Sequence, residues 1–210
     1  MRIAVFGLGY VGAVSALCLV RDGHEVIGCD IDPDKLERLR RGRSPVLEPG
    51  LDALAAAARD GGRLRLTGVA AEACDCSDVG IVCVGTPEGP DGTPDLGAMH
   101  HVRDDIGRAL AANPHPWLCI VRSTVLPGTT EEFAAALRAA VGPAVAPQLR
   151  VAFVPEFLRE ASALRDHDRP PLTLFGVEDA GSEAVLQQLY GGAGGAVRAT
   201  TPRAAALVTY

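Results

Sequence analysis

Three glycines near the start of the chain have the spacing of a phosphate-binding turn. Gly7, Gly9 and Gly12 form a G-x-G-x-x-G frame between a short apolar run and an apolar helical pattern, which is the context that this fingerprint requires. The first glycine permits a tight turn, the second lets the backbone approach a pyrophosphate, and the third lets the helix pack on the strand. Main-chain N–H groups at the helix start attract a diphosphate. We therefore predict a dinucleotide site, the alternative being a glycine-rich turn without a ligand.

An acid and a lysine follow the glycines. Asp30 ends the second apolar run, at roughly the 20-residue distance from the glycines that is typical of the motif. A carboxylate there accepts hydrogen bonds from the ribose hydroxyls and repels a 2′-phosphate, which favours NAD over NADP. Lys35 is the only lysine in the sequence. We interpret it as a second ribose contact, because lysine and arginine differ in donor geometry; a surface lysine is the alternative.

Polar residues also follow three later apolar runs. Thr86 lies in CVGTP, and Ser123 and Thr124 lie in RSTVLPGTT. The carboxyl ends of parallel strands meet at one edge of a sheet, where ligands bind. These hydroxyls are therefore candidates for a binding site, although a plain turn would also explain Thr86.

Two glutamates form the third polar group. Glu156 and Glu160 are four residues apart in VPEFLRE, and residues at that spacing share a face of a helical turn. On one face they could orient a water molecule or act as a base. The alternative is a solvated acidic turn paired with Arg159 or Arg165.

Composition limits the remaining function classes. A net charge of −6 and a pI near 5.3 argue against nucleic-acid and anionic-membrane partners. No apolar run reaches the roughly 18–20 residues of a membrane span, and the start lacks a signal-peptide pattern, so we expect a cytoplasmic protein. Four of the six cysteines lie in apolar runs, and Cys74 and Cys76 lack a second ligand pair. We therefore expect no metal site.

The elements that position these residues follow from the apolar pattern. Short β-branched runs alternate with helical patterns, which predicts an α/β fold: a single Rossmann-like domain with a doubly wound, mostly parallel sheet and helices on both faces. The runs expected as strands are residues 2–7, 24–30, 79–85, 117–123, 149–155 and 172–177, with a short strand after the glycines of 191–195. The expected helices are 10–23, 32–42, 48–61, 96–112, 129–141 and 182–192. A last helix begins in RAAALVTY, and we expect it to be cut short at Tyr210.

Seven ordered motifs together resemble the UDP-glucose/GDP-mannose dehydrogenase family, enzymes that oxidise a nucleotide sugar at C6 to the uronic acid. They are FGLGYVG, HEVIGCDID, the lysine at 35, SPVLEPGL, VCVGTP, VRSTVLPGTT and PEFLREASALRD. The resemblance covers essentially the whole chain, and the GDP-mannose members look most similar. It implies NAD as the cofactor and a nucleotide sugar as the substrate.

The resemblance assigns a role to each matching position. Around the cofactor, it places Gly7, Gly9, Tyr10, Val11 and Gly12 at the pyrophosphate, Asp30 and Lys35 at the ribose, and Thr86, Thr124 and Glu160 at the nicotinamide half. At the sugar nucleotide, it places Phe157, Leu158 and Arg159, next to Glu156. Ser44, Pro45, Glu48 and Pro49 would form a lid-like turn. Thr124, Glu156 and Glu160 would support catalysis without carrying it.

The sequence also departs from the family pattern. Val154 stands where the family's substrate loop begins with asparagine, and Thr209 stands where the family has its catalytic lysine. That lysine stabilises a developing oxyanion, which an uncharged threonine cannot do. The family's catalytic cysteine, whose thiolate traps the aldehyde, lies in a later domain. Cys29 and Cys83 belong to runs expected to be buried, so neither is a suitable replacement.

We therefore expect residues 1–198 to form an NAD-binding domain and residues 199–210 to begin the family's inter-domain helix, with the sugar-binding domain absent. The predicted function is the NAD(H)-binding part of a nucleotide-sugar 6-dehydrogenase that cannot complete the oxidation alone. The alternatives are a non-catalytic NAD-binding accessory or sensor protein, and one half of a split dehydrogenase for another substrate, completed by a partner chain. A homodimer is a further alternative for its oligomeric state.

Overall fold

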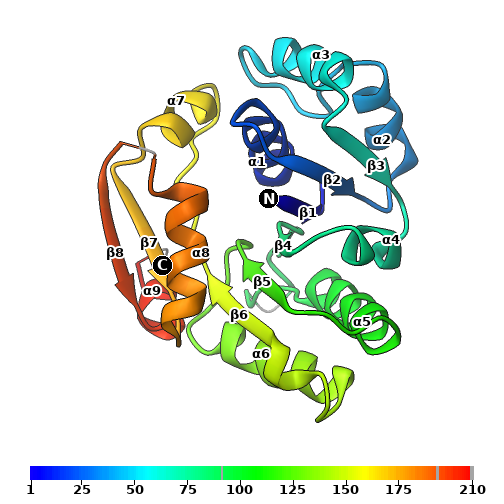
Figure 1. Cartoon of the computed structure of the whole chain (residues 1–210). Coiled ribbons are helices and arrows are strands. Elements are labelled where there is room, and N and C mark those ends of the chain that lie inside the picture. Colours follow the sequence, from blue (N-terminus) through cyan, green and yellow to red (C-terminus); the bar gives the residue numbers. More distant parts are fainter. Residues whose placement is uncertain (91, 193, 209–210) are drawn as a thin grey trace.

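The computed structural model describes residues 1–90, 92–192 and 194–208, and its central feature is one twisted sheet (Figure 1). The eight strands of the described residues are β1 (Arg2–Phe6), β2 (Glu25–Cys29), β3 (Leu64–Thr67), β4 (Val79–Val82), β5 (Trp117–Val121), β6 (Leu149–Phe153), β7 (Leu172–Gly176) and β8 (Ala196–Thr200). Their order across the sheet is β3-β2-β1-β4-β5-β6-β7-β8. The first six strands thus have the 3-2-1-4-5-6 order of a Rossmann fold.

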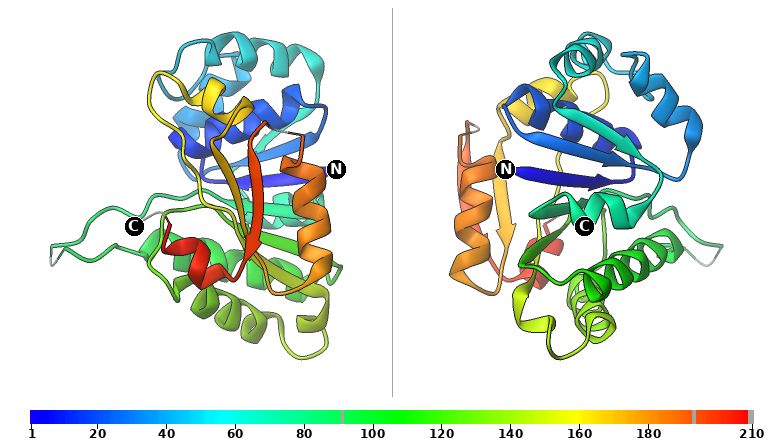
Figure 2. Two further views of the ribbon diagram at one scale, coloured as in Figure 1. Left: turned by 90° about the vertical axis from the view of Figure 1, so that its left-hand side faces the viewer. Right: turned by 45° about the vertical axis from the view of Figure 1, so that its right-hand side comes forward.

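Helices cover both faces of the sheet (Figures 1 and 2). They are α1 (Tyr10–Arg21), α2 (Pro33–Arg40), α3 (Leu51–Gly61), α4 (Ala70–Asp75), α5 (Gly97–Ala112), α6 (Thr129–Val141), α7 (Ala163–Asp168), α8 (Ala180–Tyr190) and α9 (Pro202–Ala206), with a 3₁₀ turn at Ala146–Gln148. The side chains of β1 alternate: Ile3 and Val5 join the core under α1 and α3, whereas Ala4 and Phe6 join the core under α5 and α6. This confirms the predicted doubly wound α/β architecture.

One strand pair reverses direction. β6 and β7 pair antiparallel through Phe153 and Gly176, whereas the other strand pairs are parallel. β7 and β8 extend the sheet beyond the six Rossmann strands, and α8 and α9 lie on its opposite faces there. The sequence predicted these strands but not their direction. It also did not predict β3, α4 or α7.

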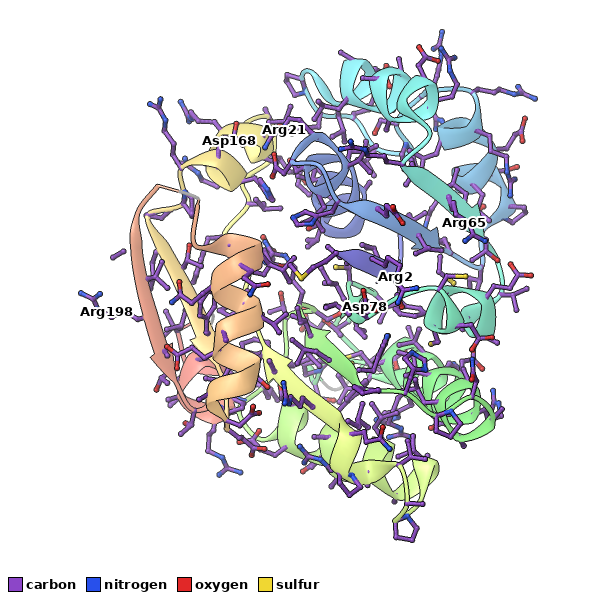
Figure 3. All side chains as sticks on the ribbon, viewed as in Figure 1. Arg2, Arg21, Arg65, Asp78, Asp168 and Arg198 are labelled. Carbon is purple, nitrogen blue, oxygen red and sulfur yellow. The ribbon has the colours of Figure 1, made fainter. Side chains whose placement is uncertain are left out.

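Charged side chains connect elements that are far apart in the sequence (Figure 3). Arg2 at the start of β1 binds Asp78, which precedes β4, with 3.2 Å between Nε and Oδ2. Arg21 at the end of α1 binds Asp168 at the end of α7, with 2.6 Å between Nη2 and Oδ1. Within the described ranges, no helix is long and apolar enough to cross a lipid bilayer.

Candidate functional site

The glycine turn between β1 and α1 lies at the point where the strand order reverses, between β1 and β4. Gly7 adopts φ +87°, and its N–H donates to the carbonyl of Cys29 at 2.8 Å. A Cβ on Gly12 would lie 1.8 Å from the carbonyl oxygen of Gly7, so only glycine fits there. A Cβ on Gly9 would meet no atom within 4 Å. The turn is therefore tightly packed beneath the helix and open in front of Gly9.

Asp30 is fixed beside this turn. Its side chain is 6% exposed, and Oδ2 accepts from the N–H of Leu8 at 2.6 Å. Oδ1 accepts from the N–H of Asp32 at 2.9 Å, and Lys35 Nζ lies 3.1 Å from Oδ2. The structure thus brings Asp30, Lys35 and the glycine turn together, and Lys35 contacts the acid directly. Pro33 starts α2 after the Asp32 N-cap, which places Lys35 in its first turn, toward Asp30.

The ends of β4 and β5 also lie next to each other. The hydroxyl of Thr86 donates to the carbonyl of Thr124 at 2.8 Å. The hydroxyl of buried Ser123 donates to the carbonyl of Val84 at 2.7 Å. These bonds link the two segments at the carboxyl edge of the sheet, where the sequence predicted that they would meet.

The predicted helical turn at Glu156 and Glu160 is absent, so the expectation that they share a helix face was wrong. The chain has no helix between β6 and α7. Glu156 instead folds onto its own loop and accepts from the N–H of Leu158 at 2.6 Å. Arg159 pairs with Asp166, with 2.7 Å between Nη2 and Oδ1, rather than with either glutamate. This hydrogen-bonded pairing holds the pKa of buried Asp166 well below its usual range.

Glu48 holds the same loop from another part of the chain. Its Oε2 accepts from the hydroxyl of Tyr10 at 2.6 Å and from the N–H of Ala161 at 2.8 Å. Its Oε1 accepts from the N–H of Ala163 at 2.9 Å. Burial and the Glu48 hydrogen bond raise the pKa of Tyr10. Tyr10 is therefore part of the glycine turn through its main chain, and its side chain joins the hydrogen bonds made by Glu48.

Ala161 adopts φ +64°, the one non-glycine residue with positive φ among those described. An L-residue pays a steric cost there, and the bond to Glu48 fixes that conformation. The family resemblance implied a lid-like turn at Glu48 but gave no sign that its side chain reaches residues 161–163. A hydrogen bond between two such distant parts of the sequence leaves no signal in the local residue pattern.

The five buried cysteines are poor nucleophiles. Cys18, Cys29, Cys74, Cys83 and Cys119 are buried, and Cys76 is partly buried. Burial raises the pKa of Cys29 and Cys83 to about 12, so their thiols stay protonated near neutral pH. Within the described ranges, no three His, Cys, Asp or Glu residues are grouped to hold a metal ion.

Val154 and Thr209 both depart from the family pattern, and the structure describes only the first of them. Val154 is 2% exposed and packs in the core beneath α1 and α8, so an apolar residue suits its position. Thr209, at the position expected for a catalytic lysine, lies outside the described residues.

The geometry of the turn fits a dinucleotide. The space in front of Gly9 lies at the N-terminus of a 12-residue helix, whose free N–H groups favour a diphosphate. Asp30 stands at the end of the neighbouring strand, within reach of the same turn.

Comparison with known proteins agrees with this geometry. The sequence model described as the UDP-glucose/GDP-mannose dehydrogenase family, NAD binding domain, matches residues 1–193. GDP-mannose 6-dehydrogenase of Pseudomonas putida is 45% identical over 191 residues, which cover 90% of this chain and 44% of that protein. UDP-glucose 6-dehydrogenase of Pseudomonas aeruginosa is 37% identical over 194 residues, with 90% and 42% covered.

Solved structures give the same result. A ternary complex of GDP-mannose dehydrogenase from Pseudomonas aeruginosa superposes with a TM-score of 0.96 at 40% identity, covering all of this chain and 48% of that one. A UDP-glucose dehydrogenase from Pyrobaculum islandicum gives 0.92 at 38% identity, with the same coverage. This chain thus spans less than half the length of these relatives. Its cofactor is NAD, and it belongs to the UDP-glucose/GDP-mannose dehydrogenase family, of which it contains the NAD-binding domain.

Proposed function

We propose that this chain holds NAD for the oxidation of a nucleotide sugar at C6, and that the sugar nucleotide is of the GDP-mannose type. The observation that carries the proposal is the glycine turn, with its open space before Gly9 and the fixed carboxylate of Asp30 beside it. The GDP-mannose preference rests on the higher identity to GDP-mannose 6-dehydrogenases than to UDP-glucose 6-dehydrogenases.

The proposed roles follow the positions of the residues. The main chain of Gly9, Tyr10 and Val11 would bind the pyrophosphate, and Gly7 and Gly12 would shape the turn. Asp30 would accept from the ribose hydroxyls, with Lys35 holding the carboxylate in place. When bound, NAD supplies the hydride acceptor for alcohol oxidation.

The substrate side of the site would be the loop after β6. Phe157, Leu158 and Arg159 would face the sugar nucleotide, because Glu48 and Asp166 fix the loop through hydrogen bonds. Thr86 and Thr124 would lie beside the nicotinamide with Glu160. Thr124, Glu156 and Glu160 would position groups rather than carry the chemistry.

We further propose that the cofactor domain corresponds to residues 1–198 and that residues 199–210 begin a connecting helix. α9 at Pro202–Ala206 supports the second part, while β8 continues to Thr200, two residues past the proposed boundary.

The chain alone should bind NAD(H) without oxidising the sugar to the acid. That oxidation needs a reactive thiolate. Five of the six cysteines are buried, and the partly buried Cys76 ends α4 just before β4, at the opposite edge of the sheet from the glycine turn.

Fluorescence titration with NADH, together with an assay of NADH production from GDP-mannose and from UDP-glucose, tests the proposal. We expect saturable NADH binding and no NADH production from either sugar. Absence of binding at millimolar NADH would contradict the cofactor role, and NADH production would contradict the statement about the isolated chain.

A further inference from the structure

A second cavity lies outside the cofactor site. Its volume is about 370 Å³, within the roughly 300–1,000 Å³ range of small-molecule pockets. It lies between α1, α7 and α8, on the face opposite α5 and α6, and none of the residues assigned to the pyrophosphate or the ribose lines it. One end reaches Phe157 and Leu158 of the proposed substrate loop.

Arg122 lines this cavity and has no anionic partner. It directly follows β5, its side chain is 7% exposed, and its Nε makes no hydrogen bond. Its guanidinium carbon lies 5.5 Å from the centre of the Tyr190 ring. No carboxylate in the described part of the chain forms an ion pair with it, although buried charges in proteins are normally paired. The contact with the aromatic ring is a cation–π interaction and leaves the Nε–H donor without a hydrogen-bond acceptor.

Tyr190 adds a second unsatisfied group. Its side chain is 8% exposed and its hydroxyl, also buried, makes no hydrogen bond. A phenol can donate one hydrogen bond to an oxyanion. Arg122 and Tyr190 therefore bring two sets of unused donors to one cavity.

The other charges of the wall are already paired. Asp22 binds Arg21 and lies 3.6 Å from His167, Asp166 binds Arg159, and Asp168 binds Arg21. Figure 3 shows Arg21 and Asp168 pointing toward one another at the outer end of this region. Among the described arginines and carboxylates of the cavity wall, Arg122 is thus the one whose charge no neighbouring group of opposite charge neutralises.

We propose that this cavity is a binding site for a small oxyanion, a carboxylate or a phosphate, held by the guanidinium of Arg122 and the hydroxyl of Tyr190. A guanidinium binds both anions through two parallel N–H donors. Thr173 lines the same cavity and provides a further hydroxyl. The site shares no residue with the proposed pyrophosphate and ribose contacts, and it meets the proposed substrate loop only at Phe157 and Leu158. Neither Arg122 nor Tyr190 has a role in the proposed function.

Calorimetric titration at constant ionic strength tests the site, with inorganic phosphate in one arm and malonate in the other. We expect saturable binding of at least one anion, and the tighter of the two identifies the ligand class. Arg122→Met should weaken that binding at least tenfold, because charge-assisted hydrogen bonds are lost. The matched control is Arg198→Met, since Arg198 is an exposed arginine of β8 that points away from the molecule (Figure 3). It makes the same change of charge and should leave the affinity within twofold of the parent.

A crystal of the parent protein soaked in selenate provides a readout that needs no variant. The anomalous selenium peak should lie in the cavity, within hydrogen-bond distance of Arg122. Absence of saturable binding in both arms, equal binding by Arg122→Met, or no selenium peak in the cavity would each overturn the proposal.

Discussion

Gly9 and Gly12 are three residues apart, yet the space around them differs completely. Gly12 packs against the carbonyl of Gly7, whereas Gly9 faces open space. Gly12 is therefore needed for the fold, and we propose that Gly9 serves the ligand. This distinction separates stability from binding at the level of single residues.

Gly12→Ala should accordingly lower stability, whereas Gly9→Ala should weaken cofactor binding. Gly12→Ala forces atoms into overlap, which costs about 1–3 kcal/mol and should lower the Tm by on the order of 5 °C for a domain of this size. Gly9→Ala should change the Tm little but weaken NADH binding, because its Cβ fills the space before the helix. Gly61→Ala is the control, since its Cβ would also meet no atom. Equal Tm values for the Gly12 and Gly9 variants would contradict this assignment.

Asp30 should determine the choice between the two nicotinamide cofactors. We expect Asp30→Asn to weaken NADH binding roughly tenfold through loss of a charge-assisted hydrogen bond. It should also narrow the preference for NADH over NADPH, because the carboxylate that repels a 2′-phosphate is gone. The measurement is fluorescence titration of both cofactors, with Asp34→Asn, an exposed acid in the first turn of α2, as the control. An unchanged ratio of the two affinities would argue against ribose recognition by Asp30.

At the scale of elements, one carboxylate connects the cofactor turn to the loop after β6. Glu48 accepts hydrogen bonds from Tyr10, Ala161 and Ala163. The loop keeps a positive-φ alanine, Ala161, near its C-terminal end, so its conformation depends on these bonds. A substitution at Glu48 should therefore weaken the hydrogen bonds that hold the loop in this conformation.

Glu48→Gln tests this connection. The amide keeps one acceptor oxygen in place of two, and a hydrogen bond to a charged group contributes about 1.5–3 kcal/mol. Hydrogen exchange at the amides of Ala161 and Ala163 should accelerate about tenfold or more, as the loop opens more often. Glu37→Gln, in a surface ion pair with Arg41, should leave both rates unchanged. Unchanged exchange in the Glu48 variant would show that the loop is held by other contacts.

The contact between α1 and α7 predicts a pH dependence. The neighbouring His167 imidazole and Arg21 guanidinium lower the pKa of Asp22 to about 2, below the ordinary value near 3.9. A carboxylate whose pKa is lower in the folded state stabilises the fold above the unfolded pKa and loses that effect as the pH falls toward the folded pKa. The free energy of unfolding should thus fall between about pH 5 and pH 2, and less steeply in Asp22→Asn. Urea unfolding at several pH values measures both slopes, and equal slopes would contradict the assignment.

At the scale of the whole molecule, the apolar periodicity predicted most of the sheet. The strands with continuous apolar runs, such as Trp117–Val121, were all found, because burial on both faces leaves an unambiguous pattern. The carboxyl-edge site followed, since parallel strands bring their ends together. Thr86 and Thr124 therefore met as expected.

Other features had no local signal. β3 at the edge of the sheet reads Leu-Arg-Leu-Thr and has only one buried residue, so its pattern resembles an exposed segment. The direction of β7 is set by its connection to β6 rather than by its composition. The spacing of Glu156 and Glu160 suggested a helical turn, but hydrogen bonds donated to Glu48 and Asp166 select an irregular loop instead. The bond to Glu48 joins distant parts of the sequence and leaves no signal in the local residue pattern.

The central claim is that the β1–α1 turn and Asp30 bind NAD. A crystal structure of this chain with NAD tests it most directly. We predict that the pyrophosphate lies at the N-terminus of α1 in front of Gly9, with the adenosine ribose hydroxyls within hydrogen-bond distance of Asp30. Electron density for the cofactor at any other surface, or a ribose that does not contact Asp30, would contradict this account.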